Sequence, residues 1–415
     1  MNNFHKIIEH LPSICYISFL IIPYLSKLCV ESNLSNASHL LGIGTISMGI
    51  LISDYIISKK YKPFKVKAYN FKHRRILFAV IMLIVIIISS IKLFYFDASL
   101  WLKYLDGQQA SAVSLERDKF EAAVGGWMGA RILNPFLHIF GILTFSGLVF
   151  YRKQFLAVCF FGFLSVVLLL STAKAPALIV FFSCLLFLAY HCSRFWTLPP
   201  LFFMAMLPIL SCAAVFYFYF KIHPLYQKHY AFVPLPQEMS DDAGDQYRRL
   251  RKDRWIEQTA ATYLAYRLFF VPIGVSARWY EFAQLPPAEK ELSRDGASSL
   301  ANAIGRWAYT GRFSEEYLPH VRAYASLDAD AFCRFAMPGV LLAALGYMAT
   351  RIVLFLSCGG TTDPLQQGLY SQGLILCSFV PYQGSLQALL GPQGVLLIIL
   401  LGFFLQWIYC KRNTA

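Results

Sequence analysis

Ten apolar runs of membrane-spanning length dominate this sequence and limit the folds open to it. A helix that crosses about 30 Å of hydrocarbon needs roughly 20 mostly apolar residues. Of all residues, 57% are hydrophobic and only 14% are charged, which is too apolar for an ordinary soluble domain. The sequence therefore predicts an all-α polytopic membrane protein. Its expected transmembrane helices are residues 11–29, 38–58, 76–96, 132–150, 155–171, 175–190, 198–220, 336–356, 365–382 and 392–409.

The basic residues predict how these helices are oriented, because short loops rich in Lys and Arg stay in the cytoplasm. The loop 59–75 carries eight Lys or Arg residues and no acid, so both termini are expected in the cytoplasm. The same distribution explains the net charge of +14 without a nucleic-acid partner. Five regions follow: N-terminal membrane helices (1–96), a first outer loop (97–131), central membrane helices (132–220), a long outer loop (221–335) and C-terminal membrane helices (336–415).

Few ionisable residues lie in the expected spans. Lys27, Asp54, Lys92 and Arg351 are all near span ends, where their side chains can reach the membrane interface and need no functional role. An ion-coupled transporter generally needs titratable or carbonyl-rich groups near the midplane of the membrane. The sequence places no acid at a span centre, which disfavours a transporter.

Three expected helix starts on the outer side combine a cation with a proline. The pairs are Lys174 with Pro176, Arg131 with Pro135, and Arg334 with Pro338. Proline is favoured in the first turn of a helix, where free backbone N–H groups and the helix dipole attract anions. Basic residues also flank membrane helices without any function. Together the three pairs predict an electropositive outer face that holds an anion at the membrane surface.

Further basic residues in the outer loops suit a lipid-linked phosphate, because Arg is the best donor for that group. Arg267 lies in an apolar, aromatic run, where an unpaired guanidinium is costly. Arg278 follows eleven residues later and shares its helix face if the helix continues past Pro272. The consecutive charges of 248–254 are expected to form a solvated face instead. Other candidate substrate-binding residues are Arg117, Lys119, Arg306 and Arg312.

The run YRLFFVPIGVSARWYEF (266–282) resembles the arginine, apolar run, proline and distal aromatic cluster of Wzy-type O-antigen polymerases, the oligosaccharide repeat-unit polymerases of bacterial inner membranes. The order of features is similar over roughly residues 95–405. An arginine is followed by glycines in the first outer loop (117–129), a cation lies at the tip of a helix hairpin (171–176), and the long loop ends in AFCRFAMPG (331–339).

The resemblance implies a metal-independent glycosyltransferase of the multi-span GT-C type at the periplasmic face of the inner membrane. Its donor would be a growing glycan on undecaprenyl pyrophosphate and its acceptor a single lipid-linked repeat unit. Membrane lipids would surround it, and a chain-length regulator is a further candidate partner. Arg267 takes the position of the family's arginine, and no cofactor is expected.

In such a reaction a sugar hydroxyl displaces pyrophosphate, so the site needs charge stabilisation and orientation more than covalent chemistry. The arginines and Lys174 suit the first role, and Glu281 or His320 is the candidate general base. The acidic stretch SDDAGD (240–245) is interpreted as a solvated loop, because no second cluster of ligands accompanies it.

Two alternatives stay open. An O-antigen ligase belongs to the same fold group, but it would usually show a stronger histidine motif in the long loop than PHVRA (319–323). A lipid-linked oligosaccharide flippase or other transporter belongs to a different class of protein.

Overall fold

The computed structural model describes eleven stretches of the chain, and all regular structure within them is helical. These stretches are residues 8–28, 37–60, 71–95, 127–151, 153–170, 174–192, 271–297, 299–309, 325–359, 363–383 and 394–410. Three short helical segments follow one another without a break at the start: α2 (Leu11–Tyr16), the π-helical turn η1 (Ile17–Ile21) and α3 (Ile22–Leu28). The others are α4 (Ala37–Lys60), α5 (Phe71–Phe94), α8 (Trp127–Phe150), α9 (Gln154–Leu170), α10 (Lys174–Cys192), α14 (Val271–Gln284), α15 (Pro287–Arg294), α16 (Leu300–Tyr309), α17 (Leu327–Cys358), α18 (Pro364–Gln383) and α20 (Val395–Cys410).

Helices lie in nine of the ten ranges that the sequence predicts as membrane spans. The remaining range, 198–220, falls outside the described residues. Within the described residues, the segments Ala37–Lys59, Ile76–Phe94 and Leu327–Cys358 are long and apolar enough to cross a membrane, and shorter apolar helices accompany them. These findings support an all-helical membrane protein.

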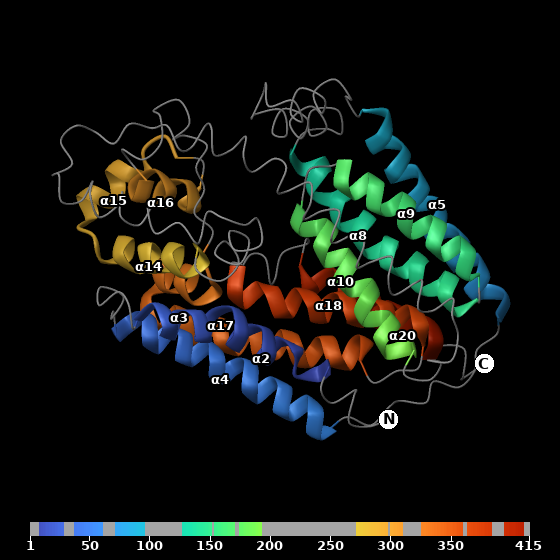
Figure 1. Cartoon of the computed structure of the whole chain (residues 1–415), viewed down its shortest axis with the longest axis horizontal. Coiled ribbons are helices and arrows are strands. Elements are labelled where there is room, and N and C mark those ends of the chain that lie inside the picture. Colours follow the sequence, from blue (N-terminus) through green and yellow to red (C-terminus); the bar gives the residue numbers. More distant parts are fainter. Residues whose placement is uncertain are drawn as a thin grey trace.

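Helices α4 and α17 pack side by side and run in the same direction (Figure 1). In their first turns, His39 Nε2 lies 4.0 Å from Asp328 Oδ2. Near their last turns, Arg351 Nε lies 3.7 Å from Asp54 Oδ1. Because these two contacts join start to start and end to end, the two helices are parallel.

The segment from α2 to α3 runs the opposite way. The Ser13 backbone N–H in α2 donates to Asp54 near the end of α4, whereas Tyr24 in α3 packs edge-on against His39 near the start of α4. The direction therefore alternates between α2–α3 and α4. We call the end of the bundle with the first turns of α4 and α17 the His39 end, and the opposite end the Arg351 end.

Helix α17 is broken at Ala336, the residue at which the sequence predicts the start of a membrane span. Ala336 has φ 53° and ψ −153°, a backbone conformation that costs energy for a residue with a Cβ. Pro338 follows it and cannot continue a regular helix because it lacks an N–H group. The break divides α17 into two helical parts, and the second part begins where the sequence predicts the span 336–356. The helical turns from Leu327 up to the break were not predicted.

The end of the long outer loop predicted for 221–335 contains three helices. Its helices α14, α15 and α16 lie together beside the His39 end (Figure 1), and we call them the cap. Val275, Trp279 and Phe282 lie on one face of α14, four and three residues apart, and form a buried cluster with Ile304 of α16. This small core holds the cap together.

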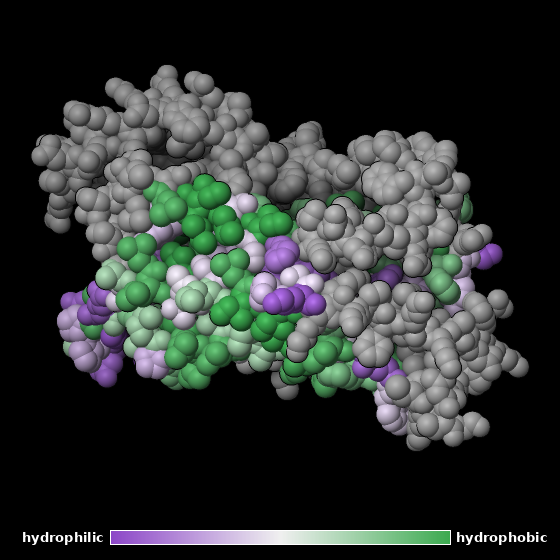
Figure 2. Space-filling model, turned by 90° about the horizontal axis from the view of Figure 1, so that it is seen from below, coloured by the Kyte–Doolittle hydropathy of each residue, from purple (hydrophilic) through white to green (hydrophobic). Residues whose placement is uncertain are grey.

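Large apolar side chains cover the outside of several bundle helices. Examples are Leu41, Met48 and Leu51 on α4, Val80, Leu83 and Ile87 on α5, and Leu341, Leu342 and Leu345 on α17, all about half exposed or more. Figure 2 shows apolar side chains over much of the described part of one face, with hydrophilic ones at its left edge and in a smaller group near its centre. Such a surface is unfavourable in water and suits a lipid environment.

Two of the three predicted helix starts also differ in detail. Helix α8 begins at Trp127, so Arg131 lies in its second turn and Pro135 in its interior rather than at a helix start. Helix α10 begins at Lys174, which puts Pro176 at the third helical position instead of the first. Lys174 therefore keeps its place at a helix N-terminus, and Arg131 does not.

Candidate functional site

The cap is fixed to the start of α17 by buried hydrogen bonds. The Ser276 and Ser326 hydroxyls lie 2.8 Å apart, and the Ser326 backbone N–H donates to Ser276 Oγ at 3.1 Å. One turn further along α14, the Tyr280 hydroxyl donates to Asp328 Oδ2 at 3.0 Å. Residues four apart lie on one helix face, so this face of α14 is held against the bundle at two points.

Asp328 is the centre of a fully buried polar group at the His39 end. Its side chain is 0% exposed, and the His39 side chain, whose Nε2 lies 4.0 Å from Asp328 Oδ2, is 1% exposed. Asp328 Oδ1 and His39 Nδ1 have no hydrogen-bond partner among the described residues. A buried carboxylate with so little compensation is costly, so this group is a place where ligand, proton or water binding would release free energy.

Aromatic rings enclose this group. The rings of His39 and Tyr280 have centroids 4.5 Å apart, and Tyr280 stacks on Phe332 at 4.4 Å. Gly42 of α4 leaves the necessary space, because a Cβ there would collide with the Tyr280 hydroxyl and crowd Asp328 Oδ2. Burial, together with the nearby Asp328 carboxylate, raises the pKa of Tyr280 far above its usual range. Tyr280 therefore stays a neutral hydrogen-bond donor.

The predicted residues Arg278 and Glu281 lie on the opposite, half-exposed face of α14. Each side chain is 44% exposed, and Arg278 Nη1 donates to Glu281 Oε2 at 2.6 Å. Arg278 and Tyr280 are two residues apart, which places them on opposite sides of a helix. The structure thus brings together one guanidinium and one carboxylate that the sequence nominated separately.

Two other predicted arginines are also close to the His39 end. Arg334 Nε pairs with Asp330 Oδ1 at 2.9 Å, one turn apart on α17, and its side chain is 42% exposed. Arg306 of α16 donates to the backbone carbonyl of Asp295 at 2.7 Å. Both keep exposed surface that an anion could contact.

The remaining predicted site residues have no described side chains. Arg117, Lys119, Arg267, Arg312 and His320 lie outside the described residues. Arg131 and Lys174 belong to α8 and α10, where only the course of the helix is described around them.

A second buried polar cluster lies at the Arg351 end. Arg351 Nη2 donates to Glu9 Oε2 at 2.7 Å and Nη1 donates to the Tyr370 hydroxyl at 2.8 Å. The Tyr370 hydroxyl in turn donates to Glu9 Oε2. Asp54 accepts hydrogen bonds from the backbone and side chain of Ser13. We call Glu9, Asp54 and Arg351 the Arg351 cluster; all three side chains are 0% exposed.

This cluster corrects the interpretation of the charges near span ends. Asp54 lies six residues before the end of α4 and Arg351 seven before the end of α17, about 9–11 Å along each helix. Both side chains point into the bundle instead of reaching the interface, and Lys92 is also buried. The prediction that these side chains reach the membrane interface was therefore wrong for Asp54, Arg351 and Lys92. The side chain of Lys27 is not among those that the structure describes. The argument against a transporter considered only span centres, and these buried charges nearer the helix ends weaken it.

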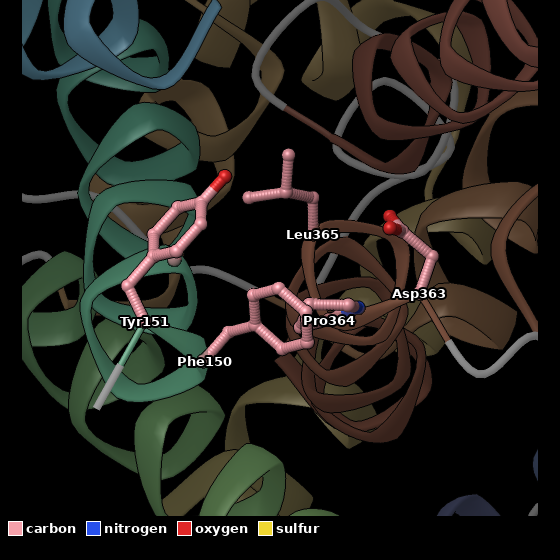
Figure 3. A pocket seen from close by; sticks show the side chains of 6 residues that line it. Phe150, Tyr151, Asp363, Pro364 and Leu365 are labelled. Atoms are coloured by element: carbon pink, nitrogen blue, oxygen red, sulfur yellow. The ribbon is translucent and has the colours of Figure 1, made fainter. Parts of the chain in front are cut away.

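A small pocket lies elsewhere, between the end of α8 and the start of α18. Phe150 and Tyr151 come from the α8 side, and Asp363, Pro364 and Leu365 from the α18 side (Figure 3). Among the described residues, no group of three or more His, Cys, Asp or Glu side chains could hold a metal ion. This pocket offers one carboxylate among apolar groups and no cation for a phosphate.

Sequence reasoning missed His39, Asp328 and Tyr280. Asp328 follows Ser326 at the start of α17, and acids in a first helical turn are a recognisable signal that was available. Tyr280 lies inside the same aromatic motif as Arg278. His39 carries no comparable signal, because only the packing of α4 against α14 and α17 makes it important.

No protein-family model, no curated protein and no solved structure matches this sequence. The chemical evidence therefore consists of the sites themselves. The cap offers a half-exposed cation and carboxylate 2.6 Å apart, suited to an anionic ligand and a proton transfer. The two buried groups offer charges and hydroxyls closed off from water.

Proposed function

We propose that this chain is a glycosyltransferase that polymerises lipid-linked oligosaccharide repeat units into O-antigen or a related surface polysaccharide. The observation that carries the proposal is the Arg278–Glu281 pair on a cap that two buried hydrogen-bond contacts fix to the bundle. The pair sets a guanidinium and a carboxylate beside apolar helices, an arrangement that suits phosphate binding and proton acceptance. The resemblance of residues 266–282 to Wzy-type polymerases supports the same function.

The pair suits both halves of the reaction. The acceptor hydroxyl attacks the anomeric carbon of the donor, the bond from that carbon to the pyrophosphate oxygen breaks, and the hydroxyl proton passes to Glu281. A guanidinium binds phosphate through two parallel hydrogen bonds, so Arg278 leaves Glu281 for the pyrophosphate when the donor is bound. When Arg278 leaves, the Glu281 carboxylate is free to accept the hydroxyl proton.

The remaining parts of the proposal follow from the same arrangement. Arg306 and Arg334 add positive charge near the cap, and Arg267 and Lys174 complete the anion-binding face. About ten transmembrane helices surround a GT-C-like site, and undecaprenyl pyrophosphate carries the donor and the acceptor. The His39 end faces the periplasm, and both termini face the cytoplasm of a bacterial inner membrane.

Gene deletion followed by a gel of the cell-surface glycan tests this function. Loss of the glycan ladder with one repeat unit still attached indicates a polymerase. Complete loss of attached glycan indicates a ligase or a flippase and contradicts the proposal. Complementation with the wild-type gene should restore the ladder, and complementation with Arg267→Lys should not, because an ammonium cannot reproduce bidentate binding.

Cysteine labelling tests the orientation in the same cells. Leu292 on α15 and Lys153 between α8 and α9 are both exposed. In a background without native cysteines, Leu292→Cys should react with an impermeant thiol reagent in intact cells and Lys153→Cys should not. The reverse pattern would place the cap in the cytoplasm and contradict the proposed site.

A flippase or proton-coupled transporter is the second candidate, because the Arg351 cluster contains two buried acids and one cation. Buried ionisable groups of this kind often mark coupling sites in membrane proteins. The two functions differ in the gel, since a flippase deletion removes all attached glycan. They also differ in the residue on which activity depends: a transporter requires Asp54, whereas a polymerase requires Arg278.

A further inference from the structure

Ala336 has a backbone conformation that is typical of glycine. Its φ of 53° and ψ of −153° lie in a region that residues with a Cβ rarely adopt. Within the described part of the chain, Ala336 is the one residue other than glycine with a positive φ. Such a conformation persists only where the surrounding contacts impose it. The contacts on the two sides of Ala336 therefore hold the chain in a strained arrangement.

The break at this residue is a sharp corner. Eight residues of a straight helix span about 12 Å, yet a Cβ on Gly339 would lie 2.5 Å from the carbonyl oxygen of Ala331. The same Cβ would lie 2.6 Å from the Cβ of Phe335. Pro338 has no N–H group to donate a hydrogen bond across the break. The two parts of α17 therefore change direction abruptly where they meet.

The first part of α17, residues 327–335, packs with the cap. Asp328 accepts the hydrogen bond of the Tyr280 hydroxyl at 3.0 Å, and Phe332 stacks on the Tyr280 ring with centroids 4.4 Å apart. Ala329 belongs to the small core that holds the cap together. We call the cap and the first part of α17 together the cap unit.

The polar contact between the cap unit and α4 is weaker. His39 Nε2 lies 4.0 Å from Asp328 Oδ2, which is too far for a hydrogen bond. The buried atoms His39 Nδ1 and Asp328 Oδ1 have no hydrogen-bond partner among the described residues. Leu327 and Ala331 pack in the core of the bundle, and the His39 ring packs on Tyr280. Separation at this boundary costs apolar contacts, but it gives water access to two unsatisfied polar atoms.

We propose that Ala336 is a hinge about which the cap unit moves away from α4, and that strain at this residue favours the open position. Hinges are often single residues at the ends of helices that absorb a change in φ and ψ. Ala336 relaxes to a common backbone conformation on opening, and Asp328, His39 and Tyr280 become accessible. The inference depends on the geometry of α17 and the cap and does not depend on the glycosyltransferase function.

Reaction of single cysteines with a permeant maleimide tests where the molecule opens. The positions are His39 on the α4 side of the boundary, Ser276 inside the cap unit and Ser53 in α4 near the Arg351 end, all at most 1% exposed. The full-length protein without native cysteines is used in lipid nanodiscs. His39→Cys should react, whereas Ser276→Cys and Ser53→Cys should react far more slowly. A hinge at Ala336 moves α14 together with the first part of α17, so position 276 stays covered.

Ala336→Gly tests whether strain drives the opening. Glycine adopts this conformation without the penalty of a Cβ, which should shift the equilibrium toward the closed position by about five- to 150-fold. The reaction of His39→Cys should slow by a similar factor when Ala336→Gly is added. Gly346→Ala is the matched control in the second part of α17, because nothing lies within 4 Å of a Cβ there. It should leave the rate unchanged.

Spin labels follow the movement with His39 in place. Leu292 of the cap and Met48 of α4 are both exposed, and electron–electron resonance measures the distance between labels at these positions. The protein with an otherwise wild-type hinge should show a second, longer distance. Ala336→Gly should reduce the population at this distance. Gly42→Ala should increase it, because a Cβ on α4 at that position collides with the Tyr280 hydroxyl.

Three results would overturn the hinge. One is equal reaction of His39→Cys and Ser276→Cys, which would show that the cap leaves α17 by itself. Another is reaction of His39→Cys no faster than that of Ser53→Cys, which would show that the boundary stays closed. The third is a reaction rate and a distance distribution that Ala336→Gly leaves unchanged, which would show that the strain has no part in the movement.

Discussion

The two ends of the α4–α17 pair bury acids in different ways. At the Arg351 end, two carboxylates surround a guanidinium that contacts Glu9 at 2.7 Å. At the His39 end, Asp328 has the Tyr280 hydroxyl at 3.0 Å and a histidine at 4.0 Å. Charge compensates charge at one end, whereas at the other a neutral tyrosine hydroxyl donates to a carboxylate.

This difference indicates different roles for the two ends. Removing the cation from a buried ionic cluster leaves two charges without compensation, so the Arg351 end should be essential to the fold. A single neutral hydrogen bond contributes less, so the His39 end can be altered without unfolding the bundle. The contact between Tyr280 and Asp328 is also one of the two hydrogen-bonded contacts between the cap and the start of α17, so a change at either residue can affect the other element.

Replacement of Arg351 by Met should have the largest effect on stability. The side chain is 0% exposed and bonds Glu9 and Tyr370, and breaking a buried ion pair costs about 3–5 kcal/mol. We expect the variant to lose most folded protein in detergent, measured as the monodisperse fraction in size-exclusion chromatography. Arg334→Met removes a half-exposed arginine of α17 instead and should remain folded. Equal behaviour of the two variants would contradict the comparison.

Gly42→Ala should have the next largest effect and acts at the His39 end. The new Cβ collides with the Tyr280 hydroxyl and approaches Asp328, and overpacking of this kind costs about 1–3 kcal/mol. Gly44→Ala is the matched control, because nothing lies within 4 Å of a Cβ at that position and Ala favours a helix by up to about 1 kcal/mol. Both are measured by thermal unfolding in detergent.

A double variant sharpens this test. Tyr280→Phe removes the oxygen atom with which the Cβ at position 42 collides, so Gly42→Ala with Tyr280→Phe should be less destabilised than the sum of the two single variants. Strict additivity would mean that Gly42 is needed for another reason.

Tyr280→Phe alone should have a smaller effect. The substitution leaves Asp328 Oδ2 without the 3.0 Å hydrogen bond, and an unsatisfied buried acceptor costs about 1–3 kcal/mol. We expect a lower melting temperature and faster protease cleavage in the cap than in the bundle, detected by mass spectrometry. Tyr55→Phe, at an exposed position of α4, is the control and should change neither.

The positions of the helices could be predicted from the sequence because long apolar runs have one stable arrangement in a membrane. The helical cap could not, since α15 and α16 are short and partly polar and their stability depends on the contacts of Val275, Trp279 and Ile304. The break at Ala336 was located by Pro338, but the helical turns before it were not predicted.

The candidate site was predicted in part. Arg278 and Glu281 were nominated separately, and their contact follows from a three-residue spacing on one helix. The burial of Asp54 and Arg351 was missed because distance from a helix end does not determine which way a side chain points. Glu9 and Arg351 are 342 residues apart in the sequence, and their pairing requires the tertiary structure.

The smallest effect on stability, and the largest on activity, is expected from the half-exposed pair of the cap. Exposed ion pairs contribute about 0–1 kcal/mol, so Arg278→Ala and Glu281→Gln should both unfold near the wild-type temperature. Arg278→Ala should abolish the glycan ladder because the pyrophosphate loses its bidentate donor, and Arg278→Lys should not restore it. Arg294→Ala removes another exposed arginine of the cap and should leave the ladder intact. Glu281→Gln should lower the rate of polymerisation while leaving binding of the lipid-linked donor unchanged, since it removes a proton acceptor and frees Arg278. A stable Arg278→Ala protein with a full ladder would separate the cap from the chemistry and leave it as a structural cover on the His39 end.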